Sequence, residues 1–250
     1  MEEDFYDILA YYYDLLQEGV DIEAWADKIH ALAIAHVKSE GEGENGGKIL
    51  VDLGCGSGAI AVRMAQKYGY EVIGVDRSEE MLNRAREREG GENVLWIGQD
   101  ITDYELFGAA DVFISTLDTI NHIIEPDDVA KIFASFKNFM APGGVFIFDI
   151  GTQKHFEQTL GNNTFFEDYD DFTLLWDNSY DEKEAMSTSA MTLFYSEDEG
   201  ETYSRCDGEI VERYYPEVLF EHLGKKYGME LVSKEFFPDD ERIIMCFRKQ

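Results

Sequence analysis

Hydrophobic and polar positions follow two different rhythms along the chain, and the change comes near residue 150. Short, β-branched runs recur after residue 47 and have the character of buried strands; they cover 48–53, 70–76, 93–100, 110–116 and 144–150. Helical periodicity fills three of the gaps between them, over 59–69, 78–91 and 126–144. This alternation predicts a parallel sheet that is covered by helices on both faces.

The segments on either side of this alternation carry other patterns. Residues 5–37 have the apolar spacing of two helices, and a Gly- and Glu-rich loop at 38–48 separates them from the first strand. Residues 164–214 alternate apolar and polar positions between acidic or glycine turns, which is typical of antiparallel strands. The chain then returns to a helix at 216–228, and 229–237 with 241–249 predict a closing hairpin.

Charge and cysteine content narrow the classes of partner. The 250 residues carry 21 Lys and Arg against 52 Asp and Glu, a formal net charge of −31. Such a field repels nucleic acid and anionic membranes, unless a local basic patch overrides it. Three widely spaced cysteines favour neither a disulfide framework nor a metal site, so we expect a reducing, cytoplasmic location and no metal. The acidic N-terminus is unlike a signal peptide, and no apolar run is long enough to span a membrane.

A glycine-rich loop, "VDLGCGSGAI" at 51–60, is the first candidate for chemistry. Gly54, Gly56 and Ala59 fit the spacing of a dinucleotide loop, and Asp76, at the end of the second strand, could accept hydrogen bonds from a ribose in either reading. Asp52 separates the readings, because a carboxylate there would repel a pyrophosphate and no Lys or Arg occurs between 49 and 61. A nucleoside that carries a sulfonium and an ammonium is favoured instead. The electrostatics therefore point to S-adenosylmethionine.

Five blocks in this order resemble the class I S-adenosylmethionine-dependent methyltransferases. They are "VDLGCGSG" (51–58), "GVDRSEEML" (74–82), "GQDI" (98–101), "ADVFISTLDTINHI" (110–123) and "FMAPGGVFIFDI" (139–150). The resemblance implies a Rossmann-like, doubly wound, seven-stranded α/β sheet whose last strand is antiparallel. The front end, with "YDILAYYYDLL" and "WADKI", resembles a small-molecule-type bacterial branch that has a tyrosine-aspartate helix over the cofactor and a β insertion after strand five.

This resemblance sets the expected domain organisation. Residues 1–150 and 216–250 would form the S-adenosylmethionine-binding core, in which 1–37 is a helical lid. Residues 151–215 would form the antiparallel β insertion, and its many aromatic side chains could roof the acceptor site or fill the insertion's own core.

The resemblance also implies the cofactor-binding positions. They are Tyr6, Tyr13, Trp25, Asp52, Gly54, Cys55, Gly56, Asp76, Arg77, Met81, Asp100, Ile101 and Leu117. The glycine loop would lie under the methionine part, with Asp52 toward the ammonium, Asp76 on the ribose and the "D" block on the adenine. The front-end tyrosines would close over the methionine carboxylate, or simply pack on the sheet. Met81 could equally be a core residue, and for Trp25 we favour an anchoring role for the second helix.

Acceptor binding is expected just after the fourth strand, at Asp118, Asn121 and His122. His122 is the one plausible proton acceptor there, although a lone histidine is more often structural. The predicted reaction is an in-line methyl transfer to a nitrogen or oxygen of a small molecule, which needs a base only when the acceptor is protonated. A tRNA or protein methyltransferase, a silent S-adenosylmethionine-binding protein and a dehydrogenase remain as alternatives. The acceptor's identity and the choice between monomer and homodimer stay open.

Overall fold

A seven-stranded sheet forms the centre of the molecule. The structure is a computed structural model and describes residues 5–39, 47–196, 198 and 200–250, without the side chains of residues 6 and 7; most of the predicted 38–48 loop lies outside the described residues. The strands are β1 (Ile49–Leu53), β2 (Glu71–Asp76), β3 (Val94–Gly98), β4 (Ala110–Ser115), β5 (Met140–Gly151), β10 (Met229–Phe236) and β11 (Arg242–Lys249). Their order is β10-β11-β5-β4-β1-β2-β3, and β11 runs antiparallel to both neighbours. The predicted fold class is confirmed.

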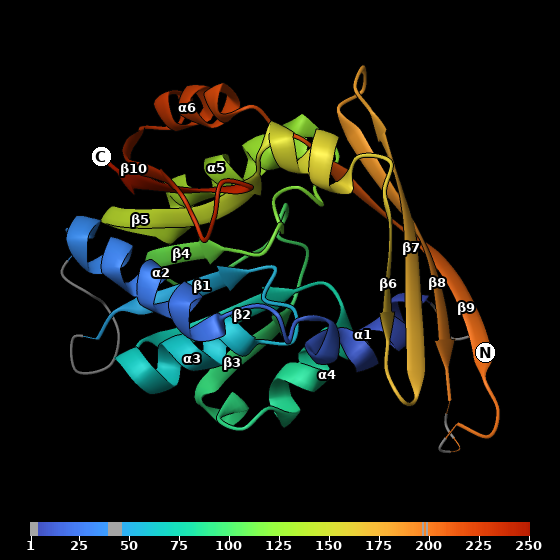
Figure 1. The fold of residues 1–250 in the computed structure, drawn as a ribbon. Helices are drawn as coiled ribbons and strands as arrows, with labels where there is room; N and C mark the ends of the chain where they lie inside the picture. Colours follow the sequence, from blue (N-terminus) through green and yellow to red (C-terminus); the bar gives the residue numbers. More distant parts are fainter. Residues whose placement is uncertain (1–4, 40–46, 197, 199) are drawn as a thin grey trace.

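Helices cover both faces of this sheet, as Figure 1 shows. On one face α2 (Ile22–His36) and α3 (Ala59–Tyr68) share a hydrophobic cluster with alternate strand residues such as Leu50 and Val112. On the other face, strand residues such as Val51 and Phe113 pack with α5 (Pro126–Phe139) and α6 (Glu217–Lys226). A further helix, α4 (Glu79–Glu87), follows β2, and the 3₁₀ turn η2 (Gly91–Asn93) leads into β3. No helix among the described residues is long and apolar enough to cross a membrane.

Local signals explain most element boundaries. The Ser78 side chain caps α4 by accepting a hydrogen bond from the Met81 N–H, and α3 ends at Gly69 in a left-handed conformation. The predicted helix over 126–144 was wrong at its end, because α5 stops at Phe139 and β5 already begins at Met140. Pro142 has no N–H to continue a helix, and Gly143 has a φ of 77°.

The insertion after β5 forms a second, four-stranded antiparallel sheet. A single π-helical turn, η3 (His155–Leu160), leads into β6 (Thr164–Asp168), β7 (Phe172–Asp181), β8 (Met186–Tyr195) and β9 (Ser204–Arg213), which pair in that order. The sequence pattern predicted antiparallel strands over 164–214, which the structure confirms, but it did not predict η3. Most side chains of β6 are exposed, so this strand lacks the alternation of buried and exposed positions that marks its neighbours.

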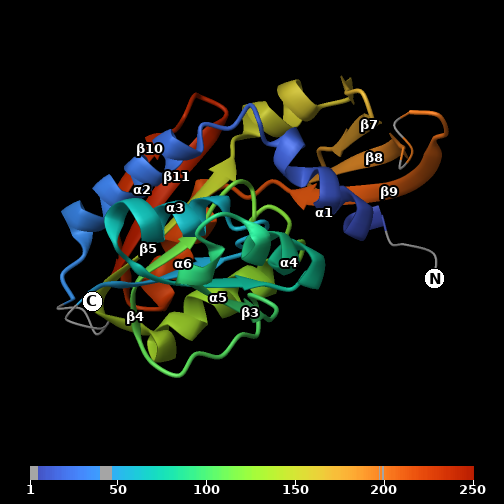
Figure 2. The same cartoon turned by 90° about the horizontal axis from the view of Figure 1, so that it is seen from below.

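The N-terminal helix α1 (Phe5–Leu16) lies between this second sheet and the carboxyl ends of the central strands, as the views in Figures 1 and 2 agree. Its apolar face meets the insertion sheet in a third core cluster, where the rings of Tyr12 and Phe172 are 4.4 Å apart between centroids. Gly208 allows Phe5 to approach β9, because a Cβ there would overlap the Phe5 ring. The helix therefore joins the insertion to the edge of the sheet where β1 ends.

Candidate functional site

The loop after β1 takes a shape that glycine alone accommodates well. Gly54, Gly56 and Gly58 have φ values of 77°, 52° and 78°, which belong to the left-handed region. A Cβ on Gly54 would also overlap the methyl group of Thr119. The Asp76 carboxylate fixes the loop from the next strand, since its Oδ2 accepts a hydrogen bond of 2.8 Å from the Gly56 N–H.

This loop forms one wall of a cavity of about 120 Å³. The lining residues come from α1, from the glycine loop, from the end of α4 and from the segment after β4; they are Tyr13, Asp14, Gln17, Ile22, Asp52, Gly54, Cys55, Gly56, Ser57, Ala59, Ile60, Arg88, Thr116, Leu117 and Thr119. Six predicted cofactor positions are thus brought together, namely Tyr13, Asp52, Gly54, Cys55, Gly56 and Leu117. Burial raises the pKa of the Cys55 thiol well above its usual value, so this side chain faces the cavity in its neutral form.

Asp52 is the least satisfied polar group of the cavity. Only 2% of the residue is exposed, and its Oδ1 has no hydrogen-bond partner among the described residues. Burial, reinforced by the charge of Asp76, raises the pKa of Asp52 to about 8. Without a ligand the carboxyl is therefore mostly protonated at neutral pH, and a cation bound beside it would favour the ionised form.

The cavity also holds an arginine that the sequence argument did not include. Arg88, just after α4, lines the cavity from 34 positions beyond Gly54, so counting cations near the loop could not find it. Its guanidinium donates two hydrogen bonds of 2.6 Å to the Asp14 carboxylate and one of 2.9 Å to the Ser57 carbonyl. Asp14 neutralises this cation, so the preference of the cavity for a positive ligand over a pyrophosphate is retained.

The remaining predicted cofactor positions lie at the ends of the neighbouring strands, outside the cavity lining. Asp76 ends β2, and Arg77 and Met81 follow it, with Met81 half-buried in α4. Asp100 and Ile101 follow β3, whose last residue pairs with Asp76. The carboxylate of Asp100 accepts hydrogen bonds from the backbone and the hydroxyl of Thr102; burial alone would raise the pKa of Asp100, but these bonds lower it.

The three predicted aromatic positions differ in what the structure says of them. The side chain of Tyr6 is outside the described part of the chain. Tyr13 faces the glycine loop, and burial, followed by the charge of Asp118, raises the pKa of its phenol to about 12. It can therefore act only as a neutral hydrogen-bonding group. Trp25, on α2, is buried against the sheet, packs edge-to-face on Phe237 and takes no part in the cavity lining.

A buried ion-pair cluster shapes the segment after β4. Leu117 and Asp118 have φ values of 58° and 66°, which is unusual for residues with side chains. The Asp149 carboxylate holds this turn by accepting a hydrogen bond of 2.7 Å from the Leu117 N–H. Arg242, at the start of β11, pairs with the carboxylates of both Asp118 and Asp149, and its contact with Asp118 uses two nitrogens. Arg242 and Asp149 were missed because no local pattern links them to the loop.

Two of the predicted acceptor residues are structural in part. Asn121 is fully buried, donates to the Arg213 carbonyl and accepts from the Gly151 N–H, so its amide ties the loop to β9 and β5. Asp118 belongs to the ion-pair cluster. His122 is different, because 46% of its side chain is exposed. Desolvation of the ring by the surrounding protein lowers the pKa of His122, and this outweighs the charge of Asp118, which raises it. The ring is therefore neutral at physiological pH and has a nitrogen lone pair that can take up a proton.

The donor set of the site fits S-adenosylmethionine. The orphaned carboxyl oxygen of Asp52 suits an ammonium group, and the open cradle at Gly56 allows close approach of a ligand to the backbone. The Asp76 carboxylate retains lone pairs for further hydrogen bonds, since each of its oxygens accepts only one bond in the described structure. Among the residues that the structure describes, the cavity wall contains no free cation for a phosphate, because Arg88 is paired with Asp14.

Proteins of similar sequence and structure include methyltransferases. A family model described as a methyltransferase domain matches residues 50–144. YqeM of Bacillus subtilis (strain 168), which is named provisionally as a methyltransferase, is 30% identical over 187 residues, or 74% of each chain. A crystal structure of an S-adenosylmethionine-dependent methyltransferase from Clostridium acetobutylicum superposes with a TM-score of 0.80, at 27% identity over 98% of both chains.

A second solved structure extends the likeness in fold. Streptomyces venezuelae DesVI covers 100% of both chains at 17% identity, with a TM-score of 0.79. The glycine loop, the acidic residues at the strand ends and these relatives agree on one family. The chain belongs to the S-adenosylmethionine-dependent methyltransferases.

Proposed function

We propose that this protein transfers a methyl group from S-adenosylmethionine to a nitrogen or oxygen atom of a small molecule. The observation that carries the proposal is the position of α1. Tyr13 and Asp14 from this helix, and Gln17 just after it, line the cavity, while the opposite face of α1 packs on the insertion sheet. We propose that α1 is the lid and the sheet is the roof of an enclosed site. A nucleic-acid substrate would instead need an open groove with cationic walls.

S-adenosylmethionine, when bound, supplies an activated methyl group on a sulfonium. The protein's own residues then bind and orient the donor and the acceptor and exclude water from the site. Asp52 and the glycine loop would hold the amino-acid part, and Asp76 would accept hydrogen bonds from the ribose. Tyr13 would donate its phenolic hydrogen from the lid side. His122, being neutral and partly exposed, would be available as a proton acceptor for a protonated acceptor group.

The solved structures of similar fold support a small acceptor without identifying it. KedS8 from Streptoalloteichus, described as a sugar N-methyltransferase, aligns over 95% of this chain with a TM-score of 0.77. At 15% identity this likeness concerns the fold alone. The acceptor must therefore be found by experiment.

A methyl-labelling assay tests this proposal. The protein would be incubated with S-adenosylmethionine labelled in its methyl group, together with bacterial metabolite extract, bulk tRNA or bacterial protein. We expect label in low-molecular-weight products, with an equal amount of S-adenosylhomocysteine. Label in tRNA or protein would favour the polymer alternatives, and binding of the donor without any turnover would indicate a silent binding protein.

A further inference from the structure

The inner face of the insertion sheet changes from apolar to polar along its length. Near α1 it is lined by Phe172, Leu174 and Leu193, whereas the far end carries four buried polar side chains, Asn178, Ser187, Ser189 and Glu212. Two of these four satisfy each other, because the Ser189 hydroxyl donates to the Asn178 side chain at 2.5 Å and the Asn178 amide donates to the Asn163 carbonyl. The other two need a separate explanation.

The side chains of Ser187 and Glu212 lie opposite each other on β8 and β9, and no hydrogen bond joins them in the described structure. They face each other in the register of β8 and β9, and their exposed fractions are 1% and 9%. The Ser187 hydroxyl is buried without a hydrogen-bond partner among the described residues. The Glu212 side chain is 12% exposed, and the one ion pair given for it in that part of the chain is the 3.8 Å approach of His122. A buried hydroxyl without a partner is unfavourable by about 1–3 kcal/mol, so a polar group bound here would satisfy Ser187 and lie beside the Glu212 carboxyl.

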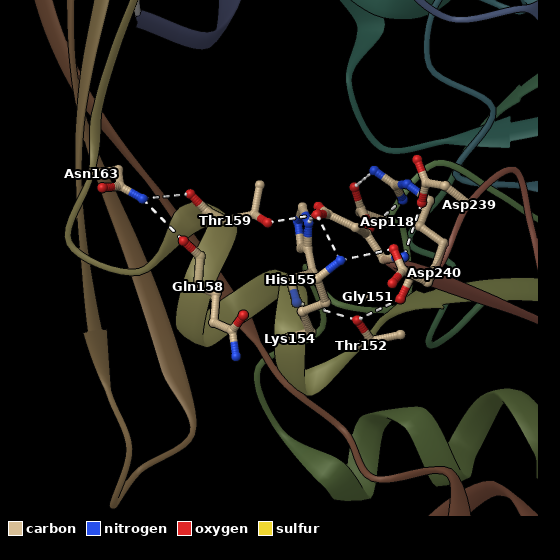
Figure 3. Close-up of polar contacts among 12 residues, drawn as sticks. Asp118, Gly151, Thr152, Lys154, His155, Gln158, Thr159, Asn163, Asp239 and Asp240 are labelled. Carbon is tan, nitrogen blue, oxygen red and sulfur yellow. Dashed lines mark hydrogen bonds and ion pairs between the residues drawn. The ribbon is translucent and has the colours of Figure 1, made fainter.

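Each basic side chain near Glu212 in the described structure is bound to another group or lies too far away for a hydrogen bond. His122 Nε2 is 3.8 Å from Glu212 Oε1, too far for a hydrogen bond, and the His122 ring is bonded to the Val211 backbone. Arg242 is bound by Asp118 and Asp149. His155, on the π-turn η3, is 3.1 Å from Glu241, which also accepts a hydrogen bond from Thr159 (Figure 3).

This polar end adjoins the methyl-donor cavity through one short segment. Thr116, Leu117 and Thr119 line the cavity, while Asp118 and His122 of the same segment face Glu212. Solvent still reaches the place, because the His122 side chain is 46% exposed. A ligand group beside Glu212 would therefore lie within one loop of the bound methyl donor.

We propose that Glu212, together with Ser187 and His122, binds the ammonium group of an amine acceptor and takes up the proton that this amine must lose. The inference rests on the proposed small-molecule methyltransferase and names its substrate class. An ammonium group offers three donors, which suit a carboxylate, a serine hydroxyl and a partly exposed, acidic wall. A neutral alcohol would leave the negative charges of this wall unbalanced.

Atoms and charges balance in this proposed step. As at Asp52, a cation bound beside Glu212 favours its ionised form, and this carboxylate then accepts one proton from R–NH₃⁺ and leaves R–NH₂ with a free electron pair. That pair forms the new N–C bond while the S–C bond electrons go to sulfur, so the products are R–NH₂–CH₃⁺ and S-adenosylhomocysteine. Burial, followed by the charge of Asp118, raises the pKa of Glu212 to about 8, which is close to that of many amines.

Fractionated acceptors test the substrate class. Bacterial metabolite extract would be separated on a cation exchanger, and each pool would be offered with methyl-labelled S-adenosylmethionine. We expect label in the cationic pool, with a loss of about a hundred-fold in Glu212→Gln. Glu209→Gln, the same change on the exposed face of β9, serves as the matched control and should stay within about two-fold.

The outcomes separate this inference from the proposed function. Label confined to neutral or anionic pools, or full labelling by Glu212→Gln, would overturn the amine assignment and leave a small-molecule methyltransferase. Absence of label from every small-molecule pool would overturn both. Calorimetric binding of S-adenosylmethionine should be the same in Glu212→Gln and the parent protein, which shows that the variant is folded.

A second readout needs no turnover. A carboxyl whose pKa is raised in the folded state loses stability as the pH rises from its unfolded value toward about 8. Unfolding by urea, measured at several pH values in this range, should therefore show a flatter pH dependence for Glu212→Gln than for Glu209→Gln. Methylammonium chloride, compared with sodium chloride, should raise the stability of the parent protein at pH 8 but not that of Glu212→Gln. Equal behaviour of the two variants would contradict a buried, ligand-seeking carboxylate at position 212.

Discussion

At the scale of single residues, we propose that Asp52 determines which nucleoside the glycine loop accepts. Its place beside the loop could be predicted from sequence, because an acid two positions before Gly54 must lie at the end of the first strand. Its protonation could not, since burial of 98% and the nearby Asp76 depend on the whole fold. Arg88 was missed for the same reason, because its contact with Ser57 spans 31 positions.

Replacing Asp52 with Asn tests the buried carboxyl directly. The raised pKa means that the folded parent protein retains a proton which the unfolded chain releases near pH 4, so its stability declines as the pH rises toward about 8. We expect this decline to be smaller in Asp52→Asn by up to about 5 kcal/mol, measured by urea unfolding across this pH range. The exposed Asp103→Asn serves as a control and should keep the parental slope.

The same variant should bind S-adenosylmethionine less tightly. Loss of a buried, charge-assisted hydrogen bond to the ligand's ammonium corresponds to about ten- to a hundred-fold in affinity. Isothermal titration calorimetry at pH 7.5 measures it. Unchanged affinity would show that Asp52 does not face the ligand.

At the scale of elements, the site depends on contacts between segments that are distant in the chain. The order of strands and helices could be predicted because each carries its own periodicity and its own turn signals. The turn after β4 could not, because Leu117 and Asp118 adopt left-handed conformations only while Asp149 and Arg242, from β5 and β11, hold them. The π-turn η3 has no periodic signature either.

Removing the guanidinium of this cluster should be strongly destabilising. Arg242→Met would leave Asp118 and Asp149 buried without their cation, at a loss of about 3–5 kcal/mol in the free energy of unfolding. Adding Asp118→Asn to the same chain should restore part of the stability. Arg205→Met, which breaks an exposed pair with Asp207, should change it by less than about 1 kcal/mol. Similar losses for both arginines in urea unfolding would refute a special role for the cluster.

The contact between α1 and the glycine loop should control the residence time of the donor. Asp14 joins the helix to Arg88 and to the Ser57 hydroxyl at 2.6 Å. Because this pair is partly exposed, we expect Asp14→Asn to change global stability by at most about 1 kcal/mol. Its dissociation of S-adenosylmethionine, followed by stopped flow, should be several-fold faster. An unaltered off-rate would mean that α1 does not act as a lid.

At the scale of the whole molecule, charge and architecture restrict the acceptor. The formal net charge of −31 opposes a polyanionic substrate, and the insertion sheet brings a further buried carboxyl, Glu212, toward the donor site. The doubly wound core could be predicted from the sequence because five ordered blocks spanned it. The buried polar end of the insertion sheet could not be predicted, because Ser187 and Glu212 meet only through the register of β8 and β9.

This charge distribution makes a prediction about nucleic acid. Filter binding of bulk tRNA at low salt, about 50 mM, should show no retention by this protein above that of serum albumin. Because low salt strengthens any electrostatic contact with tRNA, a lack of retention there would exclude a basic groove. Saturable binding that weakens steeply with added salt would return a tRNA methyltransferase to consideration.

Calorimetry shows whether the loop at 51–60 holds a methyl donor or a dinucleotide. The protein would be titrated with S-adenosylmethionine, S-adenosylhomocysteine and NADH under the same conditions. We expect saturable one-to-one binding of the first two, and no measurable heat of binding for NADH. Tight binding of NADH with no response to S-adenosylmethionine would contradict this expectation.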